Sequence, residues 1–392
     1  MGALGGTTEP PARYPLHMAK RYERWRRVGT PEEGFTYLRV NGEPVRSESG
    51  LRRIRSLAIP PAWTDVEIAP DPTAKIQAVG YDSAGRKQYR YHPAYVEKRS
   101  RRKFGKLVPF ARALPLLRAE TNLHLQRADL SREQVLATIV RLMCRAYFRV
   151  GSERYAVQNR TFGIATLGKE HLTVQGNDLI FQYIGKGRID QRRVVADTPL
   201  VEVVKEILTI PGDRLFRYLL PSGEPRDVTA RDVNEYIREL LGERYTSKDI
   251  RTWGGTVRAA TVLADLGPAE TRRAAEKNIV LTCKLVATEL GNTPAICRSA
   301  YIHPVVLESY LSGETIAPVM RKKPRPVEAE SPVTYYPEEA ALMRLLERKE
   351  QESTREGGRG AKSLTRLARS GEGSPRPRRN AHPRRRSRRS PE

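Results

Sequence analysis

The stretch GNTPAICRSAYIHP, residues 291–304, carries Tyr301 near its end, with Arg298 three residues before it and Asn292 near its start. A tyrosine on an amphipathic helix is most often a half-buried core residue. The stretch alone therefore leaves two interpretations of Tyr301 open, a packing residue or a nucleophile. The rest of the chain has to decide between them.

The chain is strongly basic. Its 392 residues contain 70 Lys+Arg against 45 Asp+Glu, a formal net charge of +25, and the sequence pI is about 10.2. A charge of this size favours a polyanionic partner, most often nucleic acid, because each neutralised phosphate releases a counterion. An arginine-rich proteome is the ordinary alternative explanation.

The cysteines and the apolar segments indicate the compartment. Cys144, Cys283 and Cys297 are odd in number and widely spaced, which argues against a disulfide framework and fits a reducing compartment. The N-terminus lacks the apolar region of a signal peptide, and no apolar stretch approaches the length of a membrane span. No zinc-ligand spacing occurs. We expect a cytoplasmic, nucleoid-associated protein without membrane contact.

Composition and periodicity divide the chain into four parts. Residues 1–20 are rich in Gly and Pro, and we expect them to be flexible. Residues 21–95 alternate apolar and polar positions, with hairpin turns at 41–42 and 82–85. Helical periodicity dominates from 96 to 320. The fold class predicted from this order is α+β, with a strand-rich N-terminal domain and a mainly helical second domain.

Residues 321–392 differ from the rest. They contain 20 Lys+Arg and 10 Asp+Glu, and one plausible helix, PEEAALMRLLERKEQ. Low hydrophobicity and high charge predict a basic, largely disordered tail. The remaining chain keeps a net charge of 25 − 10 = +15, so the tail is not its only candidate contact with nucleic acid.

The clearest helix signal is SREQVLATIVRLMCRAYFRVG, residues 131–151. Ser131 and Gln134 form a capping-box pattern, and Gly151 is placed to end the helix. A strand-rich insert follows, and Gly185-Lys186-Gly187 predicts a tight turn between two of its strands.

One motif resembles a nucleotide-binding loop but lacks a residue that such a loop needs. GIATLGKE, residues 163–170, nearly matches a phosphate-binding loop, but Glu170 occupies the position of the Ser or Thr that holds magnesium. A carboxylate there would also repel phosphates. We therefore expect a turn before a hairpin, no ATP site and no cofactor.

Four segments carry the residue types that phosphodiester chemistry needs. They supply Arg149 in FRVGSERY, Lys186 in YIGKGR, Lys248 and Arg251 after the candidate cap Ser247, and Asn292, Arg298 and Tyr301 in the opening stretch. Each has an ordinary explanation by itself, since an arginine at a helix end is mostly solvated and a Gly-Lys-Gly turn is mostly just a turn.

Together these residues could break and reseal a phosphodiester. Two arginine forks can neutralise the non-bridging oxygens. A lysine can donate a proton to the departing sugar oxygen, an effect of roughly 10²–10⁴ in rate. Asn292 can donate a hydrogen bond, and nearby positive charge favours the phenolate of Tyr301. A phosphotyrosyl ester would store the bond energy, so resealing needs neither ATP nor metal.

The motifs KDIRTWGGT, GNTPAICRSAYIHP and FRVGSERY resemble those of type IB DNA topoisomerases of the small, poxvirus-like kind found in bacteria. IPPAWTDVEIAP and KQYRYHP belong to the same resemblance, which runs from about residue 34 to 313. It implies a β-rich DNA-clamp domain at 21–95 and, at 96–320, a catalytic domain of the tyrosine recombinase/type IB topoisomerase kind. It also implies a monomer that closes around double-stranded DNA.

The resemblance assigns roles to residues. Tyr301 would be the nucleophile, with Arg149, Lys186, Arg251 and Asn292 around the scissile phosphate, and Lys186 and Arg149 would help to protonate the leaving 5′ oxygen. The implied DNA contacts are Gln88, Tyr89, Tyr91, Tyr155, Lys248 and Arg298. Poxviral and nuclear relatives have histidine where this chain has Asn292. Bacterial members often have asparagine, which would contribute hydrogen bonding and little charge.

The implied enzyme, an isomerase, relaxes positive and negative supercoils through a 3′-phosphotyrosyl intermediate, strand swivelling and religation. A tyrosine recombinase is the nearest alternative, but its second arginine usually lies in H-x-x-R, where this chain has Lys248-x-x-Arg251. Its N-terminal domain is also normally helical. A basic architectural protein with a structural Tyr301 is the non-enzymatic alternative. Replacing Tyr301 with Phe tests the architectural alternative, because DNA binding should survive while cleavage is lost.

Overall fold

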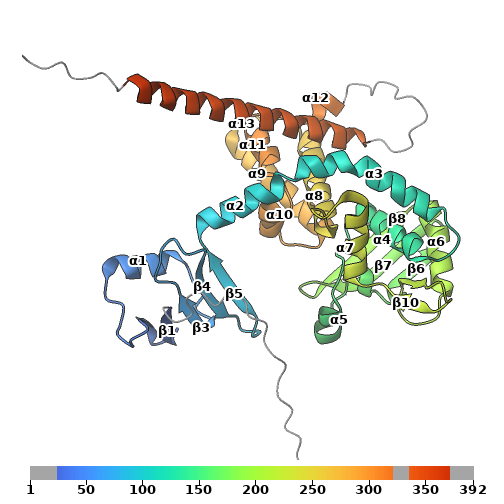
Figure 1. Ribbon diagram of the computed structural model, residues 1–392, viewed down its shortest axis with the longest axis horizontal. Coiled ribbons are helices and arrows are strands. Elements are labelled where there is room, and N and C mark those ends of the chain that lie inside the picture. The colour runs from blue at the N-terminus through green and yellow to red at the C-terminus, as the bar shows by residue number, and fades with distance from the viewer. Residues whose placement is uncertain (1–23, 321–334, 371–392) are drawn as a thin grey trace, which may run out of the picture. The chain divides into compact units, whose positions relative to one another are not determined.

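The computed structural model describes residues 24–320 and 335–370, with side chains described up to Arg355 in the last helix. The N-terminus expected to be flexible, 1–20, and the tail segments 321–334 and 371–392 lie outside the described residues. The described chain divides into two compact units between Gly105 and Lys106, and Figure 1 shows the elements of both. The functional domain boundaries expected from the sequence remain a prediction.

The first unit is a five-stranded antiparallel sheet with two helices, and its strand order is β2-β1-β3-β4-β5. Its elements are β1 (Trp25–Thr30), β2 (Gly34–Leu38), α1 (Glu48–Ser56), β3 (Thr64–Ile68), β4 (Ile76–Tyr81), β5 (Lys87–Tyr91) and α2 (Pro93–Phe104). Its core joins Ile54 of α1 to Val66, Ile68 and Ala78 of the central strands. Alternation along these strands directs the apolar side chains to this core.

The two predicted hairpin turns have different outcomes. The turn at 82–85 joins β4 to β5, and Gly85 has the left-handed φ of +69° that the turn needs. The turn at 41–42 follows β2 and closes only an isolated bridge between Leu38 and Pro44. The hairpin in this region is instead formed by β1 and β2.

The second unit is mainly helical, as expected. Its helices are α3 (Leu107–Leu125), α4 (Arg132–Ala146), α5 (Glu153–Asn159), α6 (Thr198–Thr209), α7 (Ala230–Leu241), α8 (Ser247–Leu266), α9 (Arg272–Leu290), α10 (Pro294–Ala300), α11 (Pro304–Leu311), α12 (Ala317–Met320) and α13 (Pro337–Ser370). Its strands are β6 (Leu172–Gln175), β7 (Asp178–Gly185), β8 (Ile189–Ala196), β9 (Arg217–Leu219) and β10 (Pro225–Asp227). The α+β class of the chain is thereby confirmed.

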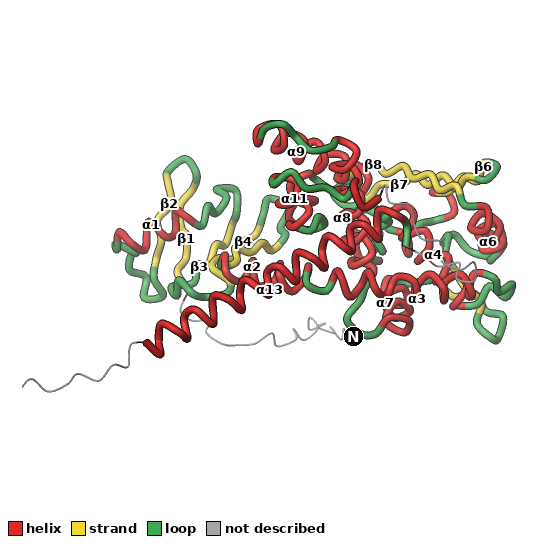
Figure 2. The backbone as a smooth tube through the Cα atoms, turned by 90° about the horizontal axis from the view of Figure 1, so that it is seen from above, coloured by secondary structure: helices red, strands yellow, loops and turns green. Residues whose placement is uncertain are grey.

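The strands β6, β7 and β8 form a three-stranded antiparallel sheet. Figure 2 shows these strands in yellow, with α4 and α6 among the helices that they contact. The predicted Gly185-Lys186-Gly187 turn joins β7 to β8. The segment at 163–170 forms two short 3₁₀ helices and leads into β6, so it is a turn before a hairpin as expected.

The start of α4 was predicted correctly, but its end was not. The Ser131 hydroxyl accepts the backbone N–H of Gln134, as an N-cap residue does. The helix ends after Ala146 and not at Gly151, because Tyr147 adopts the left-handed conformation with φ +55° and ψ +36°. A glycine was the expected terminator because non-glycine residues rarely take this conformation.

The predicted helix in the tail is α13, and it packs against the second unit. Ala341, Leu342, Leu345 and Leu346 are buried, and the helix, the long red one in Figure 1, contacts α3 and α8. Glu339 is buried as well, ion-paired to Arg118. This part of the segment expected to form a disordered tail is therefore helical and contributes to the core of the unit.

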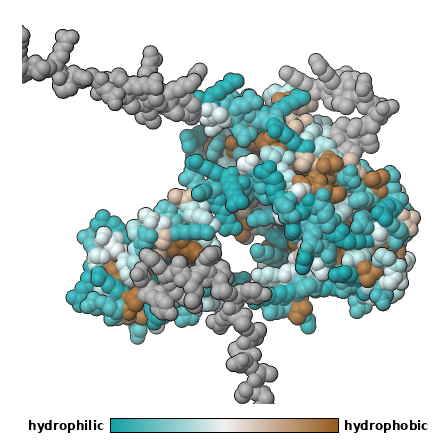
Figure 3. All heavy atoms as spheres, viewed as in Figure 1, coloured by the Kyte–Doolittle hydropathy of each residue, from teal (hydrophilic) through white to brown (hydrophobic). Residues whose placement is uncertain are grey.

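The described surface is polar. Hydrophilic side chains cover most of the face seen in Figure 3. Among residues 24–320 and 335–370, no helix combines the length and the apolar composition needed to span a membrane.

Candidate active site

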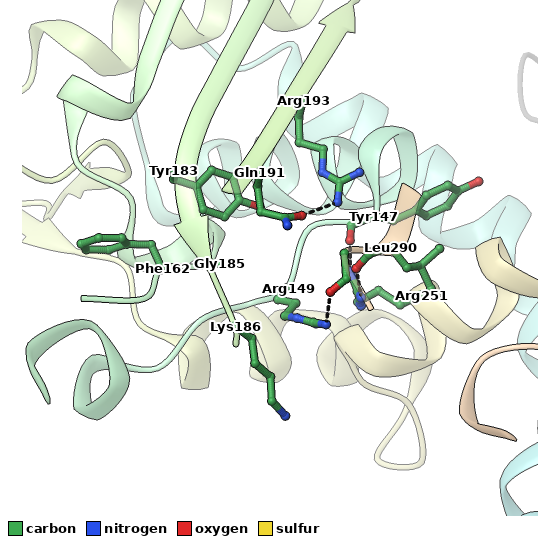
Figure 4. A pocket seen from close by; sticks show the side chains of 11 residues that line it. Tyr147, Arg149, Phe162, Tyr183, Gly185, Lys186, Gln191, Arg193, Arg251 and Leu290 are labelled. Carbon is green, nitrogen blue, oxygen red and sulfur yellow. Dashed lines mark hydrogen bonds between the residues drawn. The ribbon is translucent and has the colours of Figure 1, made fainter. Parts of the chain in front are cut away.

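Three of the predicted catalytic residues line one pocket. Arg149, Lys186 and Arg251 line a shallow pocket in the second unit (Figure 4). The other lining residues are Tyr147, Phe162, Tyr183, Gly185, Gln191, Arg193, Leu290 and Gly291. Asn292 follows the last of these directly in the chain, so the predicted constellation comes together from separate elements.

Arg149 reaches the pocket because α4 ends early. The left-handed Tyr147 turns the chain, and residues 149 and 150 then bind the backbone of Ile164 and Ala165 at 2.8 and 2.9 Å. The guanidinium of Arg149 donates to the carbonyl of Gly291 at 2.7 Å and to the side-chain oxygen of Asn292. Arg149 and Asn292, predicted to act on one phosphate, are thus in direct contact.

Arg251 lies in the first turns of α8. The N-cap is Thr246 and not the predicted Ser247, because Thr246 and Asp249 form the capping box. Only 4% of Arg251 is exposed, and its guanidinium donates to the carbonyls of Tyr147 and, at 2.8 Å, Leu290. This arginine is therefore held by backbone oxygens from two other segments.

Two glycines follow on α8 and permit close packing. A Cβ atom on Gly254 would collide with the ring of Tyr147, and one on Gly255 would lie 3.0 Å from the carbonyl oxygen of Tyr301. Glycine is unfavourable inside a helix. Its presence here brings α8 against both Tyr147 and the segment that carries Tyr301.

Asn292 is positioned by the end of α9. Gly291 adopts φ +61° and ψ +47°, the left-handed conformation that ends many helices. The N–H of Asn292 then binds the carbonyl of Ala287 at 2.9 Å, which fixes the residue at the helix end. The side-chain nitrogen Nδ2 of Asn292 is buried and meets no oxygen or nitrogen acceptor among the described residues. The thiol of Cys297, a weak acceptor, lies close enough for the Asn292 side chain to favour its thiolate.

Tyr301 lies at the end of α10 and is half-buried. Its N–H binds the carbonyl of Cys297 at 2.9 Å, and its own carbonyl accepts the hydroxyl of Thr256 on α8 at 3.1 Å. The guanidinium carbon of Arg251 lies 5.3 Å from the centre of the Tyr301 ring. Tyr301 is therefore neither a core residue nor free on the surface, and it lies beside the pocket arginines.

Lys186 is the exposed member of the group. It occupies the tip of the β7–β8 hairpin, where Gly187 has φ +82°. Its side chain extends away from Arg149 in Figure 4. An exposed lysine on a glycine-flanked tip has room to change rotamer, so this geometry permits Lys186 to turn toward a ligand in the pocket.

Positive charge accumulates in the pocket without carboxylates to balance it. Among the described residues, Arg149, Arg193 and Arg251 form no ion pair, and they are held by carbonyl and amide oxygens. Burial, followed by the charge of Arg149, lowers the pKa of Arg251 from 12.5 to about 10. Burial also lowers the pKa of Arg149. A site of this kind would be stabilised by an anion.

The predicted DNA contacts lie at the surface or near it. Tyr89 is exposed and stacks on Tyr91 at 5.9 Å between ring centres, while Gln88 donates to Asp82 at 2.9 Å. In the second unit, three exposed residues occupy three separate helices. They are Tyr155 on α5, Lys248 on α8 and Arg298 on α10. Their role in DNA binding remains a prediction.

The sequence analysis missed Gln191 and Arg193. Both lie on β8 and line the pocket, two positions apart on one side of the strand. The signal was present, because the strand continues directly from the Lys186 turn and alternation puts every second residue on one face. Alternation does not show which side packs against α9, so the sequence could not select these two residues.

Comparison with known proteins places the chain in a family. The family model "Bacterial DNA topoisomerase IB, N-terminal domain" matches residues 34–82, and "Eukaryotic DNA topoisomerase I, catalytic core" matches residues 86–321. The DNA topoisomerase 1B of Acanthamoeba polyphaga mimivirus is 31% identical over 281 residues, which cover 70% of this chain and 83% of the relative.

Two poxviral proteins give the same result at lower identity. The DNA topoisomerase 1B of Vaccinia virus (strain Copenhagen) is 25% identical over 268 residues, 65% of this chain and 80% of its own. The DNA topoisomerase 1 of Rabbit fibroma virus (strain Kasza) is 22% identical over 280 residues, 67% and 82% of the two chains. The chain belongs to the type IB DNA topoisomerase family, whose members are isomerases.

Proposed function

We propose that this protein relaxes positively and negatively supercoiled DNA by the type IB route. It cuts one strand of a duplex, lets the free 5′ end rotate about the intact strand and reseals the cut. The observation that supports this most is the arginine pocket beside Tyr301, in which the half-buried Arg149 and the buried Arg251 have no carboxylate partner among the described residues. A phosphodiester supplies the negative charge that such a pocket lacks.

Cleavage begins with attack by Tyr301. Tyr301 first gives its phenolic proton to solvent water; its phenolate oxygen then forms a bond to phosphorus, and the bond from phosphorus to the 5′ oxygen breaks. Lys186 turns into the pocket and gives its proton to that oxygen, with help from Arg149. The products are a 3′-phosphotyrosyl ester and a 5′ hydroxyl. Religation is the reverse reaction and uses neither ATP nor metal.

The pocket stabilises charge as the transition state forms. A guanidinium has five N–H donors, so Arg149 and Arg251 bind the non-bridging oxygens while they still donate to the carbonyls that hold them. The buried Nδ2 of Asn292 donates a further hydrogen bond to the phosphate. Removing one such donor lowers cleavage by about 10²–10³-fold.

Both units contribute to DNA binding. We assign duplex clamping to residues 21–95, where Gln88, Tyr89 and Tyr91 lie on the last strand of the sheet. Catalysis is assigned to residues 96–320, whose exposed Tyr155, Lys248 and Arg298 bind the duplex near the cut. The protein acts as a monomer in the cytoplasm, on the chromosome.

The test is relaxation of plasmid of either supercoil sign, in EDTA and without ATP. We compare wild type with Tyr301→Phe, and with Tyr336→Phe as a control because Tyr336 is a half-exposed tyrosine of the same unit. Wild type and the control should relax both substrates, and Tyr301→Phe should relax neither while still binding DNA.

Two outcomes would overturn the proposal. If Tyr301→Phe still relaxes DNA, Tyr301 is not the nucleophile. If wild type binds DNA but relaxes neither plasmid, the protein is a site-specific recombinase or an architectural protein. Covalent trapping of wild type on nicked duplexes would separate the last two classes, because a recombinase forms a covalent link to DNA and an architectural protein does not.

A further inference from the structure

Within the proposed reaction, we infer that Arg193 is a positioning residue. It binds the C-terminal end of α9 and so holds Asn292 where the scissile phosphate will be. Arg193 comes from β8 and lines the same pocket as Arg149 and Arg251. Neither the family resemblance nor the chemistry described above assigns it a role.

The end of α9 has oxygens that need donors. A helix leaves its last four carbonyls without partners inside the helix. Here the N–H groups of Gly291 and Asn292 satisfy two of them, on Thr288 at 3.3 Å and Ala287 at 2.9 Å. This is the pairing of a Schellman motif, and it leaves the carbonyls of Glu289 and Leu290 unpaired within the turn.

Three arginines from three separate segments bind the carbonyl oxygens that this turn leaves unpaired, together with the carbonyl that follows them. Arg193 donates to the carbonyl of Glu289, and Arg251 donates to that of Leu290 at 2.8 Å. Arg149 donates to the next carbonyl, on Gly291, at 2.7 Å. The partial negative charge of a helix C-terminus favours such cations. Consecutive residues of one helix end are thus each held by a different guanidinium.

Arg193 also connects this helix end to the lysine hairpin. Its second terminal nitrogen donates to Gln191 at 2.7 Å. The Gln191 side chain packs against Gly291, since a Cβ atom there would collide with it, and also lies 2.8 Å from where a Cβ on Gly185 would be. Gly185 and Gly291 precede Lys186 and Asn292, so the Arg193–Gln191 pair links the two active residues.

The binding mode of Arg193 favours positioning over direct contact with DNA. Its Nε is buried and has no hydrogen-bond partner among the described residues, its two terminal nitrogens donate to Glu289 and Gln191, and the side chain also lies against the hydroxyl of Tyr183. Its charge also disfavours the neighbouring cations and contributes to lowering the pKa of Arg149 and Arg251. A third positive charge in this place repels the other two arginines, which a residue needed only for packing would avoid. A guanidinium that binds the carbonyl of Glu289 can instead hold the end of α9 in a fixed orientation.

The test is single-turnover cleavage of a suicide duplex that traps the covalent complex. The variants are Arg193→Met and Arg193→Lys, with Arg192→Met as a matched control, because Arg192 is the exposed neighbour on the other face of β8. Arg193→Met should slow cleavage roughly 10- to 100-fold with unchanged DNA affinity, since a shift of about 1 Å in an active residue has effects of this size. Arg193→Lys should recover part of the rate.

The decisive readout is the double variant. If Arg193 acts through Asn292, Arg193→Met should slow an Asn292→Ala enzyme by less than about threefold, because the group it positions is already gone. Losses that multiply would overturn the inference, as would a wild-type rate for Arg193→Met. Should Arg193→Met fail to fold, Gln191→Leu tests the same link and should show the same non-additivity with Asn292→Ala.

This result is separable from the proposed function. If wild type forms no covalent complex, the proposed reaction fails whatever Arg193 does. If wild type and Arg192→Met form it at equal rates and Arg193→Met matches them, only the role of Arg193 is lost.

Discussion

Buried and half-buried arginines of the second unit fall into two groups that differ in their hydrogen-bond partners. Arg118 pairs with Glu339 at 2.8 Å, and Arg141 pairs with Asp197 at 3.0 Å. In the pocket, by contrast, Arg149, Arg193 and Arg251 are bound by carbonyl and amide oxygens and by no carboxylate of the described residues. One group is neutralised within the protein, and the other is not.

The pKa shifts of the two groups run in opposite directions. Burial alone would lower the pKa of Arg118, but the hydrogen bond and the charge of Glu339 more than offset it, and the pKa is raised. Without a carboxylate, burial and Arg149 lower the pKa of Arg251 to about 10. Arginines of the first group therefore maintain the fold, and those of the second are available to a ligand that brings its own negative charge.

The largest expected effect belongs to the paired group. Arg118→Met should lower the free energy of unfolding by roughly 3–5 kcal/mol, because it leaves Glu339 buried without its counter-charge. Urea denaturation measures this, and cleavage at low temperature should stay near the wild-type rate. The double variant Arg118→Met/Glu339→Met should regain most of the stability. A loss below about 1 kcal/mol for the single variant would show that this pair contributes little.

The next effect belongs to the pocket. Arg251→Met should slow single-turnover cleavage by about 10²–10³-fold, or about 2.7–4 kcal/mol of transition-state stabilisation. The unfolding free energy of Arg251→Met should change less than that of Arg118→Met. The Arg251 variant leaves two backbone carbonyls without a donor, whereas the Arg118 variant leaves a charged carboxylate without a partner. Urea denaturation of the two variants side by side makes the comparison. A larger stability loss for Arg251→Met would remove the distinction between the groups.

Alkaline pH should affect only the pocket. Above pH 10 the Arg251 guanidinium of the free protein loses its proton, so the cleavage rate at subsaturating DNA should fall roughly tenfold per pH unit. Between about pH 10 and 12.5 the unfolded chain holds a proton that the folded chain has lost, so this group makes the fold more stable as pH rises. Unfolding through Arg251 therefore cannot cause the fall.

A parallel measurement on Lys186→Ala identifies the group responsible. The residual cleavage of this variant should show the same fall above pH 10 if Arg251 is the source. A flat profile in the variant would show that Arg251 is not the source of the fall.

The smallest effect concerns the charges at the end of the chain. Residues 371–392 contain eight arginines and two glutamates. Deleting them should weaken DNA binding and flatten its salt dependence by about 0.9 in slope for each phosphate that these arginines neutralise. Cleavage at saturating DNA should not change. An unchanged salt slope would exclude the segment from DNA binding, and replacing the arginines by lysine should preserve the slope.

The truncation of the protein begins after residue 370 for a structural reason. A deletion from 321 onward, suggested by the composition of the tail, would also remove Glu339 and the buried Leu342 and Leu345 of α13. That variant would test the core of the second unit and not the contribution of charge.

Local signals predicted most of the site. The Gly185-Lys186-Gly187 turn, the helix carrying Arg251 and the spacing from Asn292 to Tyr301 are each encoded within a few residues. The structure brings Lys186 and Arg251 into one pocket, and their catalytic roles stay a prediction. What the sequence could not supply depends on distant partners. Tyr147 ends α4 in a left-handed conformation against Gly254, about a hundred residues away in the chain.

The same limit applies to Arg193 and α13. Alternation in β8 shows that Arg193 and Gln191 share one face of the strand. It does not show that Arg193 binds the carbonyl of Glu289, which lies on helix α9. The composition after residue 320 predicts a disordered segment. Glu339 of that segment nevertheless accepts hydrogen bonds from Arg118 and, at 3.0 Å, from the indole N–H of Trp253, which hold α13 against the second unit. Pairing between segments far apart in sequence leaves no local periodicity to detect.

The glycine pair of α8 sets a limit on engineering the enzyme for heat resistance. Replacing a glycine inside a helix by alanine is a standard stabilising change, worth up to about 1 kcal/mol per site. At Gly254 the added methyl group would strike the ring of Tyr147, and at Gly255 it would press on the backbone of Tyr301. A library aimed at thermostability should therefore leave both positions fixed and vary the solvent-facing side of the helix.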